Sequence, residues 1–422
     1  MITDNYTLLL RTGPQDLAAK TNECSVIDTI TDKAAEWTRN KRFQGGADVG
    51  TFKIYGEANQ LGAFFQTWLG LDILEIDQGI PTWNGQIRRV ELHAGSVGIA
   101  RDMNLMYNKV IVLYENDDGV VLRSTERPNN YSIAMYGARE EQVTGLLTNS
   151  TDADHQAYYI LSLHGWPPRF PCASIQEPGA APFLMCYVNG YIHSLNDKYA
   201  PYDEPFWTRP VDNIDVDDAI EDIIDDSDYI NIQRIGSNNI EVWADDGEGQ
   251  RAGDYLNTLL EITDTSRKMF HGWVDNTRQF YYESVDFTPS YYIKGGRVYA
   301  DSGATVLVAP RHISPGIFRV LDLPIKGDDE SSIFEDRRDV LIEDISIDPS
   351  GMPAYSPLDS PLSEYTNFTQ SVKRWERQSL SRPPAFPGWD EIEEMYQERI
   401  SGDWKTGGGP ESYTTGWSTG GV

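Results

Sequence analysis

Short runs of alternating apolar and polar residues fill the first third of the chain, and this pattern is typical of half-buried β-strands. One such run, residues 51–58, sets its apolar residues on a single face. Residues 108–124 begin with apolar side chains on both faces, which indicates a buried strand, and their Asp-Asp-Gly step predicts a hairpin turn. Residues 61–74 are ambiguous, but they fit a short helix that leads into another strand.

Residues 82–95 combine a turn signal with a strand signal. An Asn-Gly pair near their start predicts a turn, as in many β-hairpins. The strand expected after it alternates two apolar residues with polar ones, the apolar pair being Val90 and Leu92 and the polar set Arg89, Glu91 and His93. Such alternation predicts one face against a core and the other toward water.

Two segments between residues 131 and 200 fit helices. Residues 152–166 place apolar side chains and His164 at helical spacing, with Gly165 as a C-cap, and the prolines that follow prevent continuation. Residues 138–147 fit a short helix as well, because its two early glutamates favour a helix N-terminus.

Residues 211–229 carry nine acidic residues and no basic one. Their apolar residues fall on one face of a helix, with Asp215 as the expected N-cap. These apolar residues are Val216, Ile220, Ile223 and Ile224. A calcium-binding loop is the alternative, but Ala219 stands where a third ligand belongs and Ile220 where the turn needs glycine. The segment therefore predicts a helix with a solvated acidic face.

The later part of the chain predicts further strands and then loses its regular pattern. Residues 267–284 read as an aromatic-rich hairpin that turns at Asp275-Asn276. Three more strands are expected, at residues 306–310, 316–322 and 339–348. From about residue 350 the sequence becomes rich in Pro, Ser, Tyr and Gly, and it predicts one helix, at 388–400, and a flexible end.

Composition excludes some classes of protein. The formal net charge is −30, with 39 Asp, 26 Glu, 24 Arg and 11 Lys, so the surface repels phosphate backbones and disfavours sequence-independent nucleic-acid binding. An Asp-rich, Lys-poor surface suits high salt, although an ordinary acidic protein explains it equally well. We expect no membrane span and no signal peptide, because neither a long apolar run nor a basic leader is present. Three cysteines predict reduced thiols rather than a disulfide framework.

Candidate catalytic residues are few. Ser96 lies in Ala-Gly-Ser-Val-Gly, close to a nucleophile elbow, but the segment after it leads into another strand instead of a helix, which favours a turn. His164 and Cys172 are a candidate thiol–imidazole pair without a third group to orient them. The six histidines show no metal-ligand spacing, and no phosphate loop or dinucleotide fingerprint is present. The sequence therefore predicts no enzyme, no cofactor and no metal site.

Four short motifs occur in a fixed order: a Trp-x-Gly-x-Ile strand, a Tyr-Asn-Lys-Val-x-Val-x-Tyr strand, a Ser-x-x-x-Tyr-Gly-x-Arg-Glu step and a late Gly-Trp hairpin. Their residues are Trp83, Gly85, Ile87; Tyr107, Asn108, Lys109, Val110, Val112, Tyr114; Ser132, Tyr136, Gly137, Arg139, Glu140; and Gly272, Trp273, Arg278, Phe280, Tyr281, Tyr282. This succession, over roughly residues 45–285, resembles that of the tail hub and minor tail proteins, found at the baseplate or tail tip of tailed bacteriophages and archaeal tailed viruses.

The resemblance implies a β-rich α+β fold with two β-barrel-like domains, a smaller mixed α/β insertion and an extended C-terminal arm. The corresponding domains are residues 1–128, 129–205, 206–350 and 351–422. In this interpretation Gly137 permits the turn at a junction, and Arg139 and Glu140 begin the next helix.

The resemblance also implies a virion structural protein, made in the host cytoplasm and located at the distal end of the tail. Copies of the chain are expected to form a ring, commonly a trimer, that joins the tail tube to tip or fibre proteins and passes DNA without binding it specifically. Tyr413 and Trp417 are expected to anchor the C-terminal arm on another subunit, and folding of the arm onto its own subunit is the alternative. A host-receptor or carbohydrate-binding tail protein, with the Trp- and Tyr-rich last third as its binding face, is the rival function, and a glycan hydrolase is less favoured.

Overall fold

The computed structural model describes residues 6–13, 24–116, 119–145, 149–177, 179–200, 213–243, 249–294, 297–321, 339–348 and 353–357. The chain divides into two units, Met1–Arg377 and Gln378–Val422, and the described residues all belong to the first. The helix predicted at 388–400, and the proposed anchors Tyr413 and Trp417, lie outside the described residues.

The elements follow one another in this order: β1 Tyr6–Arg11, β2 Val26–Thr29, β3 Ala34–Arg42, β4 Gly45–Tyr55, α1 Ala58–Thr67, β5 Asp72–Asp77, β6 Ile80–Ala94, β7 Val97–Asp102, η2 Met103–Leu105, β8 Lys109–Glu115, β9 Val121–Arg123, β10 Arg127–Pro128, α2 Asn130–Tyr136, β11 Glu140–Gly145, α3 Ser150–His164, β12 Arg169–Cys172, β13 Phe183–Gly190, η3 Tyr191–Asp197, β14 Asn213–Asp215, α4 Val216–Asp225, β15 Asn231–Ile235, β16 Glu241–Trp243, α5 Ala252–Leu260, β17 Phe270–Val274, β18 Gln279–Ser284, β19 Tyr291–Lys294, β20 Arg297–Tyr299, η6 Pro310–His312, β21 Gly316–Val320, β22 Asp339–Ile347 and β23 Pro353–Pro357. The helix and strand predicted within residues 61–74 are both present, as α1 and β5.

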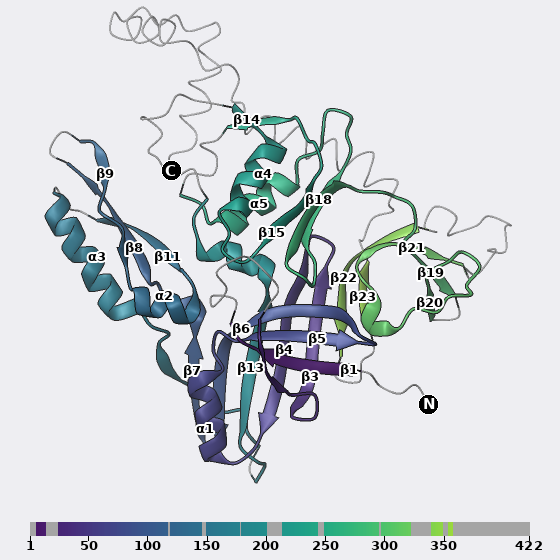
Figure 1. Cartoon of the computed structure of the whole chain (residues 1–422), viewed down its shortest axis with the longest axis horizontal. Helices are drawn as coiled ribbons and strands as arrows, with labels where there is room; N and C mark the ends of the chain where they lie inside the picture. The colour runs from purple at the N-terminus through teal and green to yellow at the C-terminus, as the bar shows by residue number, and fades with distance from the viewer. Residues whose placement is uncertain are drawn as a thin grey trace, which may run out of the picture. The chain divides into compact units, whose positions relative to one another are not determined.

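Most strands belong to one extended mixed sheet (Figure 1). Neighbouring strands pair in the order β1–β5–β6–β13–β4–β3–β22–β21–β19–β20. Strand β6 pairs with β5 over its first half and with β7 over its second half, while its other edge pairs with β13. The core of this part of the molecule is rich in aromatic residues, among them Trp37, Phe52 and Trp83.

A smaller unit is inserted between two paired strands of that sheet. The chain leaves the sheet after β7 and returns as β12, which pairs with β7. Between them lies a four-stranded sheet ordered β10–β8–β11, with β9 paired to β8, and helix α3 lies along β8 (Figure 1). The core of the unit consists of apolar residues of β8 and α3, namely Val110, Val112, Tyr114, Ala153, Ala157 and Leu161. The predicted helix at 152–166 and hairpin at 108–124 are therefore confirmed.

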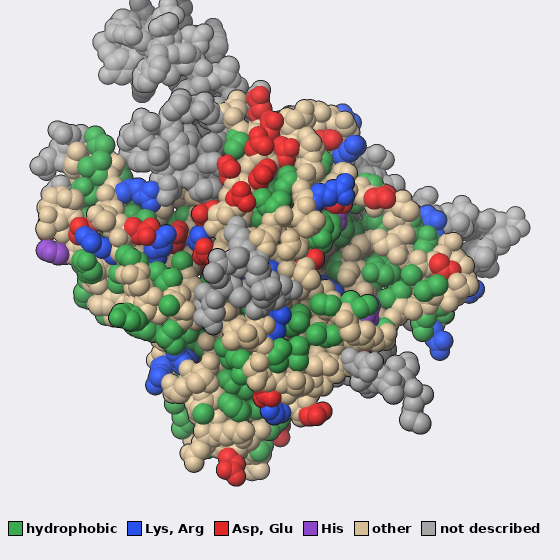
Figure 2. All heavy atoms as spheres, in the orientation of Figure 1, with side chains coloured by type: hydrophobic (Ala, Val, Ile, Leu, Met, Phe, Trp, Pro, Cys, Tyr) green, Lys and Arg blue, Asp and Glu red, His purple; other side chains and the backbone are tan. Residues whose placement is uncertain are grey.

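Helices α4 and α5 pack on each other and against strands β15 and β17. The four apolar residues predicted on one face of α4 are all buried, whereas Asp and Glu side chains gather on its outer surface (Figure 2). Asp215 occupies the N-cap position, as predicted, but its side chain makes no capping hydrogen bond. The hairpin of β17 and β18 is also confirmed, with its turn at Asp275-Asn276.

The Asn84-Gly85 pair is not a turn, because both residues lie inside the long strand β6. A Cβ atom at Gly85 would lie 2.5 Å from the carbonyl oxygen of Asn189 on β13 and 2.6 Å from the Trp83 ring. Glycine is needed at this position because the backbone of the neighbouring strand approaches too closely for a side chain.

The helix predicted at residues 138–147 is wrong, because Glu140–Gly145 forms strand β11, parallel to β8. The Glu140 carboxylate lies 2.7 Å from Lys109 Nζ, and Glu141 pairs with Arg251. The two glutamates, which in sequence suggest the N-terminus of a helix, are therefore partners in ion pairs. The pairing of β11 with β8 overrides the local helix propensity.

Two further expectations differ from the structure. The strand expected at 306–310 is absent, because Leu307 makes an isolated bridge to Tyr299 and a 3₁₀ helix begins at Pro310. The resemblance also places residues 109–115 in the first barrel-like domain, but β8 pairs with β9, β10 and β11 in the separate sheet of the inserted unit, where α3 packs on it.

The β-rich α+β class is confirmed by this arrangement. The sheets formed by the described residues do not close into barrels, so the two barrel-like domains are not confirmed. The bounds 1–128, 129–205, 206–350 and 351–422 stay predictions. In the part of the chain that the structure describes, no helix is both long enough and apolar enough to span a bilayer.

Candidate functional site

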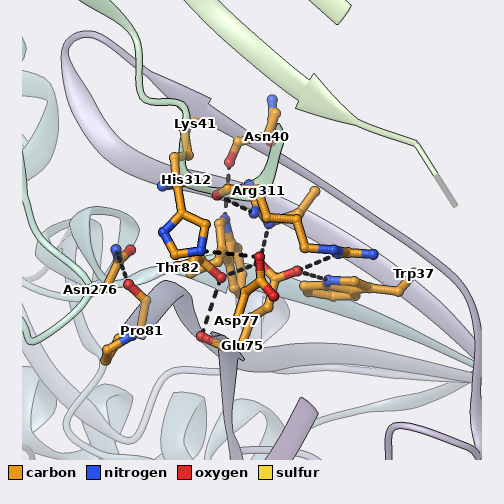
Figure 3. Close-up of polar contacts among 12 residues, drawn as sticks. Trp37, Asn40, Lys41, Glu75, Asp77, Pro81, Thr82, Asn276, Arg311 and His312 are labelled. Atoms are coloured by element: carbon orange, nitrogen blue, oxygen red, sulfur yellow. Dashed lines mark hydrogen bonds and ion pairs between the residues drawn. The ribbon is translucent and has the colours of Figure 1, made fainter. Parts of the chain in front are cut away.

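A buried ion cluster centred on Glu75 joins segments that are far apart in the sequence (Figure 3). The Glu75 carboxylate, on β5, accepts hydrogen bonds from Arg39 on β3 and from Arg311 on η6, the second at 2.7 Å. Trp37 Nε1 and Thr82 Oγ1 donate to the same carboxylate at 3.2 and 2.9 Å. The side chains of Glu75 and Arg39 have no exposed surface. Burial raises the pKa of Glu75, but the guanidinium groups of Arg39 and Arg311 outweigh this effect and hold it below its ordinary value.

Further contacts extend the cluster to other elements. The Arg311 guanidinium lies 4.0 Å from the centre of the Tyr6 ring on β1, and His312 Nε2 lies 3.1 Å from the Asp77 carboxylate. Asn276, in the β17–β18 turn, donates to a β6 backbone carbonyl at 3.0 Å. Figure 3 shows Arg311 and His312 of η6 beside Glu75 and Asp77 of β5, with Asn276 next to Pro81. The cluster thus fixes β1, β3, β5 and β6 to the later segments of the chain.

A cavity of about 320 Å³ lies next to Lys41 and is also lined by residues of β17 and of the segments around Tyr291 and Ser314. Lys41 is buried, and its Nζ lies 3.4 Å from Ser314 Oγ. Among the described residues, no carboxylate forms an ion pair with Lys41. Burial, with a smaller contribution from the nearby Arg39 charge, lowers the pKa of Lys41 to about 7.

Four rings beside this cavity stack in a row. The centroid distances are 4.4 Å from Phe43 to His271, 4.4 Å from His271 to Trp273 and 5.0 Å from Trp273 to Tyr281. Burial lowers the pKa of His271 to about 4, so its ring is neutral at pH 7. The motif residues Trp273 and Tyr281 therefore hold the hairpin through ring stacking.

The other motif residues of this hairpin serve packing. A Cβ atom at Gly272 would lie 2.6 Å from Leu260 Cδ2, so a larger residue would displace the Leu260 side chain of α5. Arg278 is buried, and its guanidinium lies 5.2 Å from the centre of the Tyr191 ring. The Tyr191 hydroxyl in turn donates to Asp72 on β5. The hairpin turn is therefore joined to the extended sheet at a second buried polar cluster.

The Tyr-Asn and Tyr-Gly motifs meet where the inserted unit joins the rest of the molecule. Asn108 Nδ2 donates to the Gly137 carbonyl at 2.8 Å, and Asn108 Oδ1 accepts from the Arg139 backbone N–H at 2.7 Å. Arg101 on β7 donates to the Tyr136 hydroxyl at 3.0 Å. Gly137 has φ +80°, which glycine adopts readily. The turn predicted at Gly137 is present, but Arg139 and Glu140 lead into strand β11 instead of the expected helix.

A buried aspartate completes this junction. The Asp197 carboxylate, at the end of η3, lies 2.7 Å from Arg139 Nη2 and 2.7 Å from Arg88 Nη1. All three side chains are less than a tenth exposed. Breaking such a buried pair leaves an uncompensated charge, so these contacts fix the inserted unit to β6 and η3.

The remaining motif residues are structural as well. Trp83 donates to the Asn40 carbonyl at 3.0 Å and packs edge-on against Trp37. Tyr107 lies against His164, with ring centroids 5.7 Å apart, and Val110 belongs to the core of the inserted unit. The motif positions are therefore spread over several joints and do not gather into one open site.

The two candidate catalytic sets are not assembled. Ser96 is exposed in the tight turn between β6 and β7. His164 contacts Tyr107, whereas Cys172 lies beside Glu91 and His93. The alternating pattern of residues 82–95 predicts Glu91 and His93 on the water-facing side of the strand. Both Glu91 and His93 are buried.

The signal that points to the ion clusters is the presence of Asp72 and Glu75 within the otherwise apolar start of β5, since buried acidic residues need partners.

Replacing Lys41 with methionine is expected to stabilise the protein by about 3 kcal/mol at pH 7, because a buried ammonium without a carboxylate partner is removed. The pKa of Lys41 is depressed in the folded state, so the wild type gains stability as pH rises from about 7 to the ordinary lysine pKa of about 10.5. The difference between the two proteins should therefore shrink over this range in urea unfolding experiments. Lys53→Met, at a more exposed lysine paired with Glu36, is the control. A Lys41→Met variant less stable than the wild type at pH 7 would contradict this account.

Comparisons with known proteins give weak likenesses. No family model and no curated protein sequence matches this chain. Several solved structures do match, among them a tail protein from Neisseria meningitidis (11% identity, 84% of this chain and 97% of that chain, TM-score 0.37) and a 43 kDa tail protein of prophage MuSo2 from Shewanella oneidensis (9% identity, 86% of this chain and 98% of that chain, TM-score 0.38). Both are tail proteins, but TM-scores below 0.5 do not establish a common fold.

Proposed function

We propose that the chain is a structural protein of a viral tail, a hub-like subunit that forms a ring, most simply a trimer, between the tail tube and the tip or baseplate. The observation that carries this proposal is the role of the motif residues. Asn108, Gly137 and Arg139 join the inserted unit to the sheet, and Gly272 and Arg278 fix the late hairpin. These residues hold the parts of a rigid subunit together and do not form a reaction centre, as expected of a structural protein.

The charge and the surface of the chain agree with this role. A net charge of −30, with acidic residues exposed along α4 (Figure 2), would repel DNA phosphates and keep a passing genome from binding. Large apolar side chains are exposed on several elements, as ring interfaces need. They include Val26 and Ile27 on β2, Val97 and Ile99 on β7, and Tyr158, Tyr159 and Leu163 on α3.

The neighbours of the chain follow from the same proposal. They are copies of itself, the tail tube, and tip or fibre proteins, in a virion assembled after synthesis in the host cytoplasm. The C-terminal arm would extend along another subunit with Tyr413 and Trp417 as anchors. The two tail proteins named above, at TM-scores of 0.37 and 0.38, give the proposal no support by themselves.

Self-assembly is the property to measure first. The full-length protein is expected to form a closed ring, with the mass of three chains in the simplest case, in native mass spectrometry and negative-stain electron microscopy. Because hubs can require the tube as a template, the same measurement is made with purified tail tubes added. A chain that stays monomeric at micromolar concentration, and does not bind the tubes, would contradict the proposal.

Recognition of a host receptor or carbohydrate is the second candidate. The cavity beside Lys41 favours it, since about 320 Å³ is enough space for a small ligand. The stacking of His271, Trp273 and Tyr281 on one another weighs against sugar binding there, because ring faces in mutual contact are not free to stack on a sugar. Binding on a glycan array without ring formation would favour this second candidate.

A further inference from the structure

Three side chains capable of binding a metal converge on one face of the extended sheet. They are Glu91 and His93 on β6 and Cys172 at the end of β12, and one ligand atom from each lies within 4.8 Å of the others. Residues two apart on a strand share a face, so Glu91 and His93 point the same way. Cys172 on β12 pairs with Gly98 on β7, and Gly98 pairs with His93 on β6. The thiol and the imidazole therefore lie on either side of Gly98.

The glycine between them makes this approach possible. A Cβ atom at Gly98 would lie 2.8 Å from Cys172 Sγ, so any larger residue would push the thiol away. Because Gly98 has no side chain, the thiol can lie across β7 toward the carboxylate and imidazole of β6. The sequence shows no such site, since Cys172 lies 79 residues after His93, on a strand that is joined to β6 through β7.

The distance between the His93 and Glu91 ligand atoms suits a tetrahedral ion. His93 Nε2 lies 3.3 Å from Glu91 Oε2, and two ligands on a tetrahedral ion with bonds of about 2.0 Å are separated by about 3.3 Å. His93 is completely buried, and its Nδ1 has no hydrogen-bond partner among the described residues. An imidazole that carries its proton on Nδ1 presents the Nε2 lone pair to such an ion.

Outer contacts fix the carboxylate and balance the charge. Arg89 Nε donates to Glu91 Oε1 at 2.9 Å, and the Tyr187 hydroxyl donates to Oε2 at 3.0 Å. The Asp102 carboxylate lies 3.5 Å from Arg89 Nη1 and offsets its charge. With the thiol deprotonated, the two carboxylates, the thiolate and the guanidinium sum to −2, which a divalent cation neutralises. Hydrogen bonds of this kind orient metal-ligating carboxylates in proteins.

We propose that Glu91, His93 and Cys172 form a binding site for a divalent transition metal, with zinc as the preferred ion and water as the fourth ligand. Thiolate and imidazole ligands select zinc or a similar borderline ion over calcium and magnesium. The bound ion would join β12, which pairs with β7 at the end of the inserted unit, directly to β6. It would thereby fix the return of the chain into the extended sheet.

Cobalt(II) titration of the untagged, reduced, full-length protein tests this site. One cobalt ion per chain is expected, with the visible bands of tetrahedral cobalt and a near-ultraviolet sulfur-to-cobalt charge-transfer band. Cys172→Ser should abolish the charge-transfer band, and His93→Gln should weaken binding at least about tenfold. Cys24→Ser, at a cysteine elsewhere in the fold, is the matched control and should leave the band unchanged.

Thermal unfolding gives a second measurement. Zinc is expected to raise the Tm of the wild type and of Cys24→Ser but not that of Cys172→Ser, because the ion binds the folded chain through this thiol. Cys172 is only partly buried, so the serine variant should fold, which circular dichroism can verify. A wild-type protein without the charge-transfer band, or a folded Cys172→Ser variant that keeps it, would overturn the proposal.

Discussion

The Gly137→Ala variant is expected to lose roughly 4 kcal/mol or more of its free energy of unfolding, an effect at the extreme of single substitutions. A Cβ atom at this position would lie 1.5 Å from the Tyr229 hydroxyl oxygen, and the backbone has φ +80°. Either Tyr229 or the whole junction must therefore move. Urea unfolding followed by tryptophan fluorescence measures the loss, and Tyr229→Phe in the same chain should recover part of it.

Gly79→Ala separates the steric effect from the backbone effect. Gly79 has φ +81°, almost the same as Gly137, but a Cβ atom there meets nothing within 4 Å. Its substitution should cost only about 1–2 kcal/mol, the penalty of a left-handed conformation. Equal stabilities of the two alanine variants would show that the contact between the inserted unit and Tyr229 is not as close as described.

The Glu75→Gln variant is expected to lose about 3–5 kcal/mol, because it leaves the buried Arg39 guanidinium without a charged partner and weakens the contact with Arg311. Folding depresses the pKa of Glu75, so its stabilising effect is present above the ordinary glutamate pKa of about 4.3 and is lost as pH falls below it. The wild type and the variant should therefore converge in stability at acidic pH.

Glu36→Gln is the matched control for this prediction. Glu36 pairs with Lys53, but its side chain is half exposed, and such pairs contribute about 0–1 kcal/mol. The ratio between the two effects isolates the contribution of burial. A Glu75→Gln variant as stable as Glu36→Gln at pH 7 would mean that the cluster does not hold the segments of the first unit together.

Local patterns predict the elements whose partners lie nearby. The apolar spacing in α4 predicts its buried face because one helix turn repeats every 3.6 residues. The β17–β18 turn follows from Asp275, whose carboxylate accepts the backbone N–H groups of Thr277 and Gln279 at 2.7 and 2.9 Å. In both cases the residues that determine the structure lie within a few positions of one another.

Local patterns fail where distant segments decide the structure. Glu140 belongs to a strand because it pairs with Lys109, and Gly85 belongs to a strand because β13 approaches it. The Glu75 cluster joins residues separated by 36 and by 236 positions. Such partners have no spacing that a single sequence reveals, so the partners of Asp72 and Glu75 in the ion clusters, and the assembly of the Glu91–His93–Cys172 group, are not predictable from it.

A cryo-electron microscopy map of intact virions that contain this chain, fitted with the described residues, tests the proposed function most directly. The account predicts that copies of the chain form a closed ring on the tail axis at the distal end of the tail, around a lumen wide enough for DNA and between the tube and the tip. Copies at peripheral fibres only, copies in the capsid, or virions without the chain would contradict it.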